Sequence, residues 1–164
     1  MEASGRIVQI SVSPGGLPKL PIPQAQVTPA GVAGDRQKNL KFHGGPDRAV
    51  CLWSLEVIEA LQAEGHPMAP GLAGENITLA GLHWPSLAPG THLHLGKTLR
   101  VEITDYAAPC RQNMKWFADR RFSRISQKHY PGSSRLYGRV LAEGMIQPGD
   151  PVILRDLGKV RACV

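Results

Sequence analysis

Residues 87–95 read Leu-Ala-Pro-Gly-Thr-His-Leu-His-Leu, and residues 146–154 repeat the same pattern as Ile-Gln-Pro-Gly-Asp-Pro-Val-Ile-Leu. In both stretches a Pro-Gly turn leads into a segment of alternating pattern, which is typical of a β-strand. Barrels reuse corners of this kind, because each strand must turn and tilt to meet the next one. The two stretches therefore predict a closed or strongly curved β-sheet.

Turn residues divide the rest of the chain into short segments. The 18 glycines and 14 prolines are scattered along the 164 residues, which leaves little room for long helices. We expect strands at residues 6–12, 20–27, 49–53, 76–79, 92–95, 98–106, 135–141 and 151–155. We also expect one helix capped by Ser54, and a second over residues 110–120 with Met114 and Phe117 on its inner face. The sequence thus predicts a mainly β fold with a few short helices.

Length and cysteine content indicate the class of protein. A chain of 164 residues fits a single domain, and we expect its core at about residues 6–155 and a C-terminal tail at 156–164. Three cysteines cannot all pair, so the sequence favours a reducing compartment and a cytoplasmic protein. The N-terminus lacks the apolar segment of a signal peptide, and no stretch approaches the roughly 18 apolar residues that span a bilayer. We therefore expect no membrane association.

Cys110 is the cysteine most suited to chemistry. It lies between Pro109 and Arg111, where the strand pattern of residues 98–106 gives way to an amphipathic stretch. Helical N–H groups and a nearby cation both lower the pKa of a thiol. Cys51 lies within an apolar run and Cys163 lies next to the C-terminus, so neither is interpreted as a functional residue.

Positive charge follows Cys110 directly. Residues 111–139 contain eight Lys or Arg and one acidic residue, a net charge of +7, so that the rest of the chain carries −1 of the total of +6. Such a field favours a ligand with phosphate or carboxylate groups. A solvated basic face without a partner is the alternative. Nucleic acid is disfavoured, because no recognised nucleic-acid-binding module is present.

Two polar segments could contact such a ligand. Residues 38–50 form a glycine-rich loop in which Gly44 and Gly45 can aim backbone N–H groups at an anion, flanked by His43 and Arg48. The alternative is an ordinary turn in which Arg48 pairs with a carboxylate. Residues 74–76 read Gly-Glu-Asn and offer hydrogen-bonding groups at a strand edge, for a heterocyclic ring or for the loop itself.

Residues that share a strand face, and a possible cysteine–histidine pair, could also carry chemistry. The period of a strand places Arg135, Tyr137 and Arg139 on one face, which could bind phosphate or face water. The same parity puts His92 and His94 together, but strand-face histidines are commonly solvated and no zinc motif is present. Pairing of Cys110 with a histidine, at position 43 or 129, remains open. No Walker A, G-x-G-x-x-G or G-x-S-x-G motif occurs.

Five segments in series resemble the MOSC domain, the family named for the C-terminal part of molybdenum cofactor sulfurases. They are residues 34–37, 43–50, 74–76, 104–110 and 134–139. The resemblance implies a single domain with a closed, β-barrel-like fold and one functional cysteine, which maps onto Cys110. Members include sulfur-transfer proteins, amidoxime-reducing enzymes and single-domain bacterial proteins that reduce N-hydroxylated bases.

The resemblance implies the molybdenum cofactor, a pterin with a dithiolene and a phosphate, as the ligand. Cys110 would then be the catalytic residue and the molybdenum ligand, since a soft thiolate suits that metal. Glu75 and Asn76 would lie near the pterin. The phosphate or ring would contact the glycine-rich loop and some of the basic side chains, from the set Lys38, His43, Gly44, Gly45, Arg48, Arg111 and Arg139.

Two functions follow from the resemblance. One is a molybdenum-dependent reductase of N-hydroxylated compounds, with electrons from a separate donor protein. The other is a non-enzymatic carrier, in which Cys110 holds persulfide sulfur from a donor protein or binds the cofactor passively. Both need a partner, because the chain contains no pyridoxal-phosphate desulfurase domain and no cysteine-rich cluster domain.

Overall fold

The computed structural model describes residues 4–36 and 45–155, and it confirms the mainly β fold. The strands are β1 (Ser4–Val12), β2 (Leu20–Ile22), β3 (Ala25–Thr28), β4 (Gly31–Val32), β5 (Val50–Ser54), β6 (Ile77–Ala80), β7 (His92–Leu95), β8 (Leu99–Ala107), β9 (Arg135–Ala142), β10 (Gly144–Ile146) and β11 (Pro151–Arg155). The helices are α1 (Leu55–Ala63) and the short 3-10 helices η1 (Pro46–Arg48), η2 (Trp84–Ser86), η3 (Arg111–Trp116) and η4 (Phe122–Ile125).

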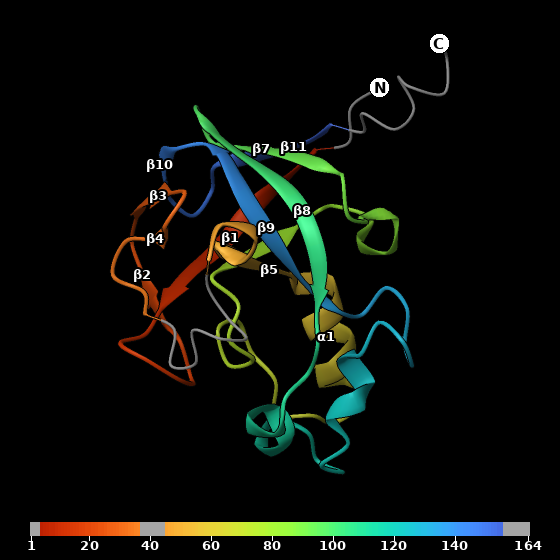
Figure 1. Cartoon of the computed structure of the whole chain (residues 1–164). Helices are drawn as coiled ribbons and strands as arrows, with labels where there is room; N and C mark the ends of the chain where they lie inside the picture. The colour runs from red at the N-terminus through yellow and green to blue at the C-terminus, as the bar shows by residue number, and fades with distance from the viewer. Residues whose placement is uncertain (1–3, 37–44, 156–164) are drawn as a thin grey trace.

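Seven of these strands close into a barrel (Figure 1). They follow the order β11-β7-β8-β9-β5-β6-β1, and β1 pairs back with β11. All neighbours in this ring are antiparallel except β5 and β6, which α1 connects. The two Pro-Gly stretches supply β7 and β11, which pair directly, with Leu95 opposite Val152. The closed sheet expected from those stretches is thereby confirmed.

Side-chain alternation fills the barrel interior. Along β8, Leu99, Val101 and Ile103 are buried, and the residues between them face outward in part or in full. Such alternation directs one face of every strand into the core. The expected strand at 20–27 is interrupted: its first half, β2, extends the main sheet beside β1, and its second half, β3, joins β4 and β10 in a separate sheet.

The first predicted helix is confirmed. The Ser54 hydroxyl accepts a hydrogen bond from the Val57 N–H at 3.2 Å and caps α1, and the inward residues Ile58 and Leu61 are fully buried. Among the described residues, no helix combines the length and apolar character that crossing a membrane requires.

The second predicted helix, over residues 110–120, is wrong. Only the 3-10 helix η3 forms, and Phe117 already has an extended backbone, although its side chain is buried as expected. The Asn113 side chain accepts a hydrogen bond from the Cys110 N–H at 3.1 Å and donates one to the distant Ala73 carbonyl at 3.1 Å. Such side-chain bonds to the backbone compete with a continuing helix, and here they tie the segment to the barrel.

Substitution of Gly138 by alanine should lower the free energy of unfolding by about 1–3 kcal/mol, because the added methyl group has no space. Gly138 lies between Val50 and Ile103 in the barrel wall, and a Cβ atom there would overlap the Val101 side chain. Urea denaturation measures the change. The control is Leu141→Ala on the same strand, which is 47 % exposed and should change stability by about 0.5 kcal/mol or less. Equal losses in the two variants would contradict this account.

Candidate functional site

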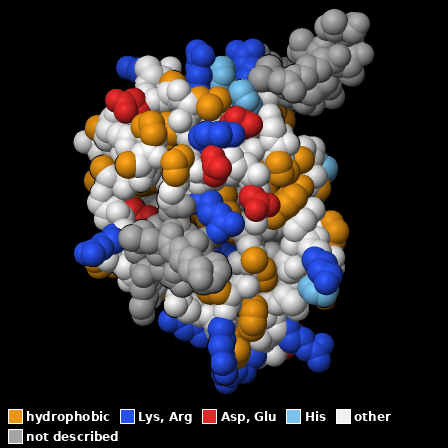
Figure 2. Space-filling model, in the orientation of Figure 1, with side chains coloured by type: hydrophobic (Ala, Val, Ile, Leu, Met, Phe, Trp, Pro, Cys, Tyr) orange, Lys and Arg blue, Asp and Glu red, His pale blue; other side chains and the backbone are white. Residues whose placement is uncertain are grey.

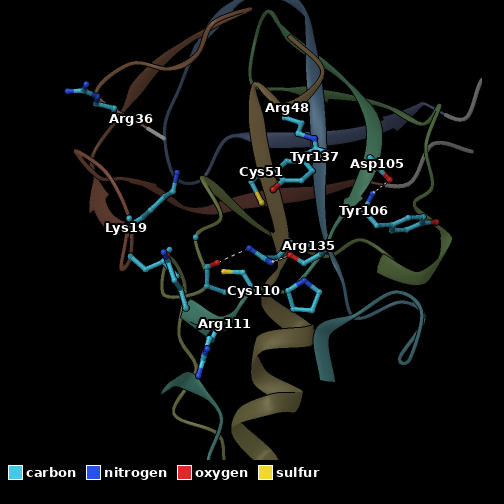
Figure 3. A pocket seen from close by; sticks show the side chains of 17 residues that line it. Lys19, Arg36, Arg48, Cys51, Asp105, Tyr106, Cys110, Arg111, Arg135 and Tyr137 are labelled. Atoms are coloured by element: carbon cyan, nitrogen blue, oxygen red, sulfur yellow. Dashed lines mark hydrogen bonds between the residues drawn. The ribbon is translucent and has the colours of Figure 1, made fainter. Parts of the chain in front are cut away.

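A cavity of about 810 Å³ opens beside Cys110, where β8 ends and β9 begins (Figure 3). Its walls come from five regions: the loop after β1, Arg36 after β4, the segment around β5, the loop before β6, and the segments that flank β8 and β9. The lining residues are Gly16, Leu17, Lys19, Arg36, Arg48, Cys51, Ala73, Gly74, Asp105, Tyr106, Ala108, Pro109, Cys110, Arg111, Gln112, Arg135 and Tyr137.

The lining of this cavity is strongly cationic. Its lysine and arginine residues come from five separate segments of the chain, whereas Asp105 is the one acidic residue among the lining residues. Cations that converge on one hollow attract an anionic ligand more strongly than the same charges spread over a surface. The cationic members are Lys19, Arg36, Arg48, Arg111 and Arg135. The cavity is therefore suited to a ligand that carries phosphate or carboxylate groups.

Arg135 holds the segment that carries Cys110. Its Nη1 donates to the Ala73 carbonyl at 2.8 Å, and its Nη2 donates to the Ala108 carbonyl at 3.0 Å. Asn113 reaches the same Ala73 carbonyl from the far side of Cys110. The Cys110 side chain is half-buried and lies in a segment anchored on both sides. Such anchoring fixes the direction of the thiol before a ligand arrives.

A buried polar chain supports the opposite wall. The Lys19 ammonium donates to Asp35 Oδ2 at 2.6 Å, and both side chains are almost fully buried. Asn76 Nδ2 donates to the same Asp35 oxygen at 2.9 Å, and Asn76 Oδ1 accepts from the Cys51 N–H at 3.0 Å. This chain of hydrogen bonds connects a cation of the cavity to the strand that carries Cys51.

Cys51 is buried, as the sequence indicated, but it lines the same cavity as Cys110 (Figure 3). It stands opposite Tyr137 in the β5–β9 pairing, and the Arg48 guanidinium lies 5.0 Å from the centre of the Tyr137 ring. Burial raises the pKa of Cys51 to about 11 and that of Tyr137 to about 12. Both groups therefore keep their protons at neutral pH.

Eight of the ten candidate residues fall into three groups. Cys110, Arg48 and Arg111 line the cavity. Glu75 and Asn76 are fully buried and do not line it. Lys38, His43 and Gly44 lie outside the described residues.

Two further candidates are also placed outside the lining. Arg139 forms ion pairs with Asp47 at 3.2 Å and with Glu102 at 3.4 Å, so it does not join Arg135 and Tyr137 at the cavity. Gly45 precedes η1 with a φ of 82°, a conformation that favours glycine.

The carboxyl group of Glu75 is buried and forms a hydrogen bond within the protein. Its Oε2 accepts from the Thr78 hydroxyl at 3.1 Å, and burial raises the pKa of its carboxyl group. On β7, His92 lies 3.9 Å from Glu102. Among the described residues, no three or more His, Cys, Asp or Glu side chains gather in a way that could hold a metal ion.

Sequence reasoning assigned no function to Lys19, Arg36 and Cys51, which line the cavity. It left Arg135 and Tyr137 open, as a face that could bind phosphate or contact water. Arg36 belongs to segment 34–37, and Arg135 and Tyr137 belong to segment 134–139, so the motif segments already contained them. Lys19 follows a proline in a stretch without a motif. Lys19 is recognised only in the folded structure, where it forms a buried ion pair with Asp35.

Thiol alkylation should distinguish the two cavity cysteines. Because the pKa of Cys51 is raised to about 11, it remains a protonated and unreactive thiol at pH 8 and ionises only in strong alkali. We expect iodoacetamide at pH 8 to modify the half-buried Cys110 at least tenfold faster than Cys51. Peptide mass spectrometry after a time course measures both rates. Equal rates at pH 8 would contradict this assignment.

These features define a class of protein, namely closed β-barrels with a half-buried cysteine at the mouth of a cationic cavity. Comparison with known families agrees with this class: the model of the MOSC domain matches residues 39–153. The chain belongs to the MOSC domain family, which confirms the resemblance seen in the sequence.

Two bacterial proteins are related in sequence. YflK of Bacillus subtilis (strain 168) is 32% identical over 128 residues, which cover 77% of this chain and 56% of YflK. YiiM of Escherichia coli (strain K12) is 34% identical over 95 residues, which cover 53% of this chain and 40% of YiiM. The chain thus spans about half the length of these relatives or less.

Solved structures share the fold. The crystal structure of YiiM from Geobacillus stearothermophilus superposes with a TM-score of 0.72 at 27% identity, covering 93% of this chain and 75% of that one. The YuaD protein of Bacillus subtilis has a TM-score of 0.76 at 15% identity and covers 94% and 97% of the two chains, which supports the fold alone.

Proposed function

We propose that this protein binds the molybdenum cofactor in the Cys110 cavity and, when loaded, reduces N-hydroxylated compounds. One observation carries the proposal: a half-buried thiol lines a cavity whose lining also includes five Lys or Arg residues. A soft ligand for a metal and cations for a phosphate are therefore present in one place. The family membership supports the same cofactor.

The residues fit this cofactor. The dithiolene sulfurs of the cofactor would already ligate the molybdenum, and the Cys110 thiol would add one soft protein ligand. Among the described residues there is no larger ligand cluster that would suit a bare metal ion. Arg135 is a lining residue, and its Nε is buried without a hydrogen-bond partner among the described residues. Such an orphan donor is consistent with a polar ligand.

We assign the cavity residues as follows. Cys110 holds the metal, and the phosphate is held by cations on the opposite wall, from the set Lys19, Arg36 and Arg48, with Arg111 at the mouth. Lys38, His43, Gly44 and Gly45 belong to the loop that leads to Arg48, and we keep them as proposed contacts. Asn76 acts indirectly, by positioning Asp35 and the Cys51 backbone, and the buried Glu75 beside it is kept as a proposed neighbour of the pterin. Arg139 is assigned a weaker, long-range electrostatic role because carboxylates pair with it.

The cofactor supplies the redox chemistry that amino-acid side chains lack. In the overall reaction the N–O bond of an N-hydroxylated compound breaks, the nitrogen takes up one proton to give the amine, and the hydroxyl takes up the second and leaves as water. Two electrons and two protons are consumed, and a separate redox protein supplies the electrons. Arg135 and Asn113 hold the Cys110 segment, while Tyr137 stays protonated in the cavity wall.

A carrier is the second candidate function. The exposure of Cys110 at the cavity mouth would equally allow a donor protein to place persulfide sulfur on it, or allow the cofactor to be passed on. The barrel would then supply a protected thiol and no catalysis.

Metal analysis separates the two candidates. Protein isolated from cells that make the cofactor should contain close to one molybdenum per chain and should reduce hydroxylaminopurine with a chemical or protein electron donor. Metal-free protein that releases thiocyanate on treatment with cyanide would instead identify a persulfide carrier. Absence of both metal and labile sulfur would overturn both candidates.

A further inference from the structure

A second, shallower depression adjoins the Cys110 cavity. Its volume is about 490 Å³, and it shares Gly16, Leu17, Arg111 and Gln112 with the cavity. It extends from this common wall over η3, toward Lys115 and Arg120. We call this depression the annex. A ligand that enters the Cys110 cavity can therefore extend into the annex without leaving the protein surface.

The annex is lined by cations and lacks acidic residues. Arg111, Lys115 and Arg120 line it, all three are exposed, and no aspartate or glutamate is part of the lining. None of these three side chains forms an ion pair with a described carboxylate. Lys and Arg side chains gather at this end of the molecule, below the barrel (Figure 2). The annex therefore offers charges that no described acidic residue already satisfies.

Contacts other than acids position two of these cations. The backbone of Arg120 has a φ of 62°, which is uncommon for a residue other than glycine, and its N–H donates to the Phe117 carbonyl at 2.9 Å. Its Nε lies 3.3 Å from the sulfur of Met114, another lining residue. The Lys115 ammonium lies 4.8 Å from the centre of the Trp116 ring. Both charges are held beside the annex before any ligand binds.

We propose that the annex binds the phosphate of a phosphorylated substrate, specifically an N-hydroxylated nucleoside monophosphate. This inference rests on the proposed function, which assigns the deeper cations to the phosphate of the cofactor. The cations of the annex are then available for a second anion, the phosphate of the substrate. The annex is shallow and open, which suits a group that must enter and leave in every catalytic cycle, and the shared wall at Arg111 lets the base extend toward Cys110.

Substrate preference tests the proposal in molybdenum-loaded protein. The ratio of kcat/KM for hydroxylaminopurine ribonucleoside 5′-monophosphate to kcat/KM for the free nucleoside should be at least about 10 at low salt, because the phosphate gains charge-assisted contacts. In the variant Lys115→Gln/Arg120→Gln the ratio should fall to about 2 or below. The control Arg121→Gln removes a neighbouring exposed charge that does not line the annex, and it should keep the ratio of the wild type.

Binding to cofactor-loaded protein without an electron donor gives a readout that does not depend on catalysis, because the cofactor then occupies the deeper phosphate site. Titration calorimetry should show adenosine monophosphate binding at least tenfold tighter than adenosine, and this difference should disappear in the double variant but not in the control. No preference for the phosphate, or an equal preference in the double variant, would overturn the annex proposal. Tighter binding of single-stranded oligonucleotides than of the monophosphate would overturn it in favour of nucleic-acid binding.

The two proposals fail in distinguishable ways. Loaded protein that reduces nucleoside and monophosphate equally well would support the reductase and overturn the annex. Protein without molybdenum or activity that still selects adenosine monophosphate through Lys115 and Arg120 would support the annex and overturn the reductase.

Discussion

Cys110→Ser is expected to lower both the molybdenum content and the reductase activity of the protein by about 100-fold or more. Loss of residues that merely support a metal ligand already costs about 10- to 100-fold, and this change removes the ligand itself. A serine hydroxyl is a hard donor that stays protonated at neutral pH, so it replaces the soft thiolate poorly. Elemental analysis of protein purified from cofactor-producing cells and a hydroxylaminopurine assay measure the two losses.

The matched control is Cys51→Ala, because Cys51 lines the same cavity but is buried and stays protonated at neutral pH. We expect this variant to retain most of the molybdenum, and circular dichroism should show that both variants are folded. Retention of metal by Cys110→Ser would contradict the ligand assignment. An equal loss of metal in the two variants would point to damage of the cavity instead.

Asp35→Asn is expected to lower the free energy of unfolding by about 3–5 kcal/mol, which is the range for removing one partner of a buried ion pair. The side chains of Lys19 and Asp35 are 5% and 7% exposed, and their charged atoms are 2.6 Å apart. Without the carboxylate, the Lys19 ammonium remains in a site with little access to water. Urea denaturation followed by tryptophan fluorescence measures the loss.

A second variant separates the loss of stability that is due to charge from the loss that is due to the change in side-chain shape. In Lys19→Met/Asp35→Asn both charges are absent. An asparagine oxygen can still accept the hydrogen bond that the Ser13 N–H now donates to Asp35, but the asparagine NH2 group then faces the Asn76 Nδ2 donor and that hydrogen bond is lost. We expect this double variant to recover part of the stability that Asp35→Asn loses. A loss below about 1 kcal/mol in the single variant, or no recovery in the double variant, would argue against a buried charge as the cause.

Most strands were predictable because side-chain alternation is a local signal. The pattern of residues 92–95 and 98–106 agrees closely with β7 and β8, and Ser54 marked the start of α1 correctly. The segment after Cys110 was not predictable in the same way. Its apolar spacing resembles a helix, but Asn113 bonds to Ala73, a residue 40 positions earlier in the chain.

The candidate site was partly predictable. Cys110, Arg48 and Arg111 could be named from the residues around them, and the structure places them in one cavity. Cys51 could not be named from its sequence neighbours, because an apolar run does not indicate which cavity its strand lines. The alternation of side chains along a strand placed Arg139 on the same face as Arg135. In the structure, however, Arg139 forms ion pairs with the carboxylates of Asp47 and Glu102.

The amino-acid sequence alone was sufficient to establish a strand-rich, closed sheet of the MOSC family with a cysteine at a strand end and a basic segment after it. These properties can be predicted from periodicity, turn residues and short motifs, because each of these signals extends over only a few neighbouring residues. The set of cations that faces Cys110, the entry of Cys51 into the same cavity and the annex beside it required the folded barrel. These features depend on the register between distant strands, such as Cys51 opposite Tyr137, and short-range patterns do not encode that register.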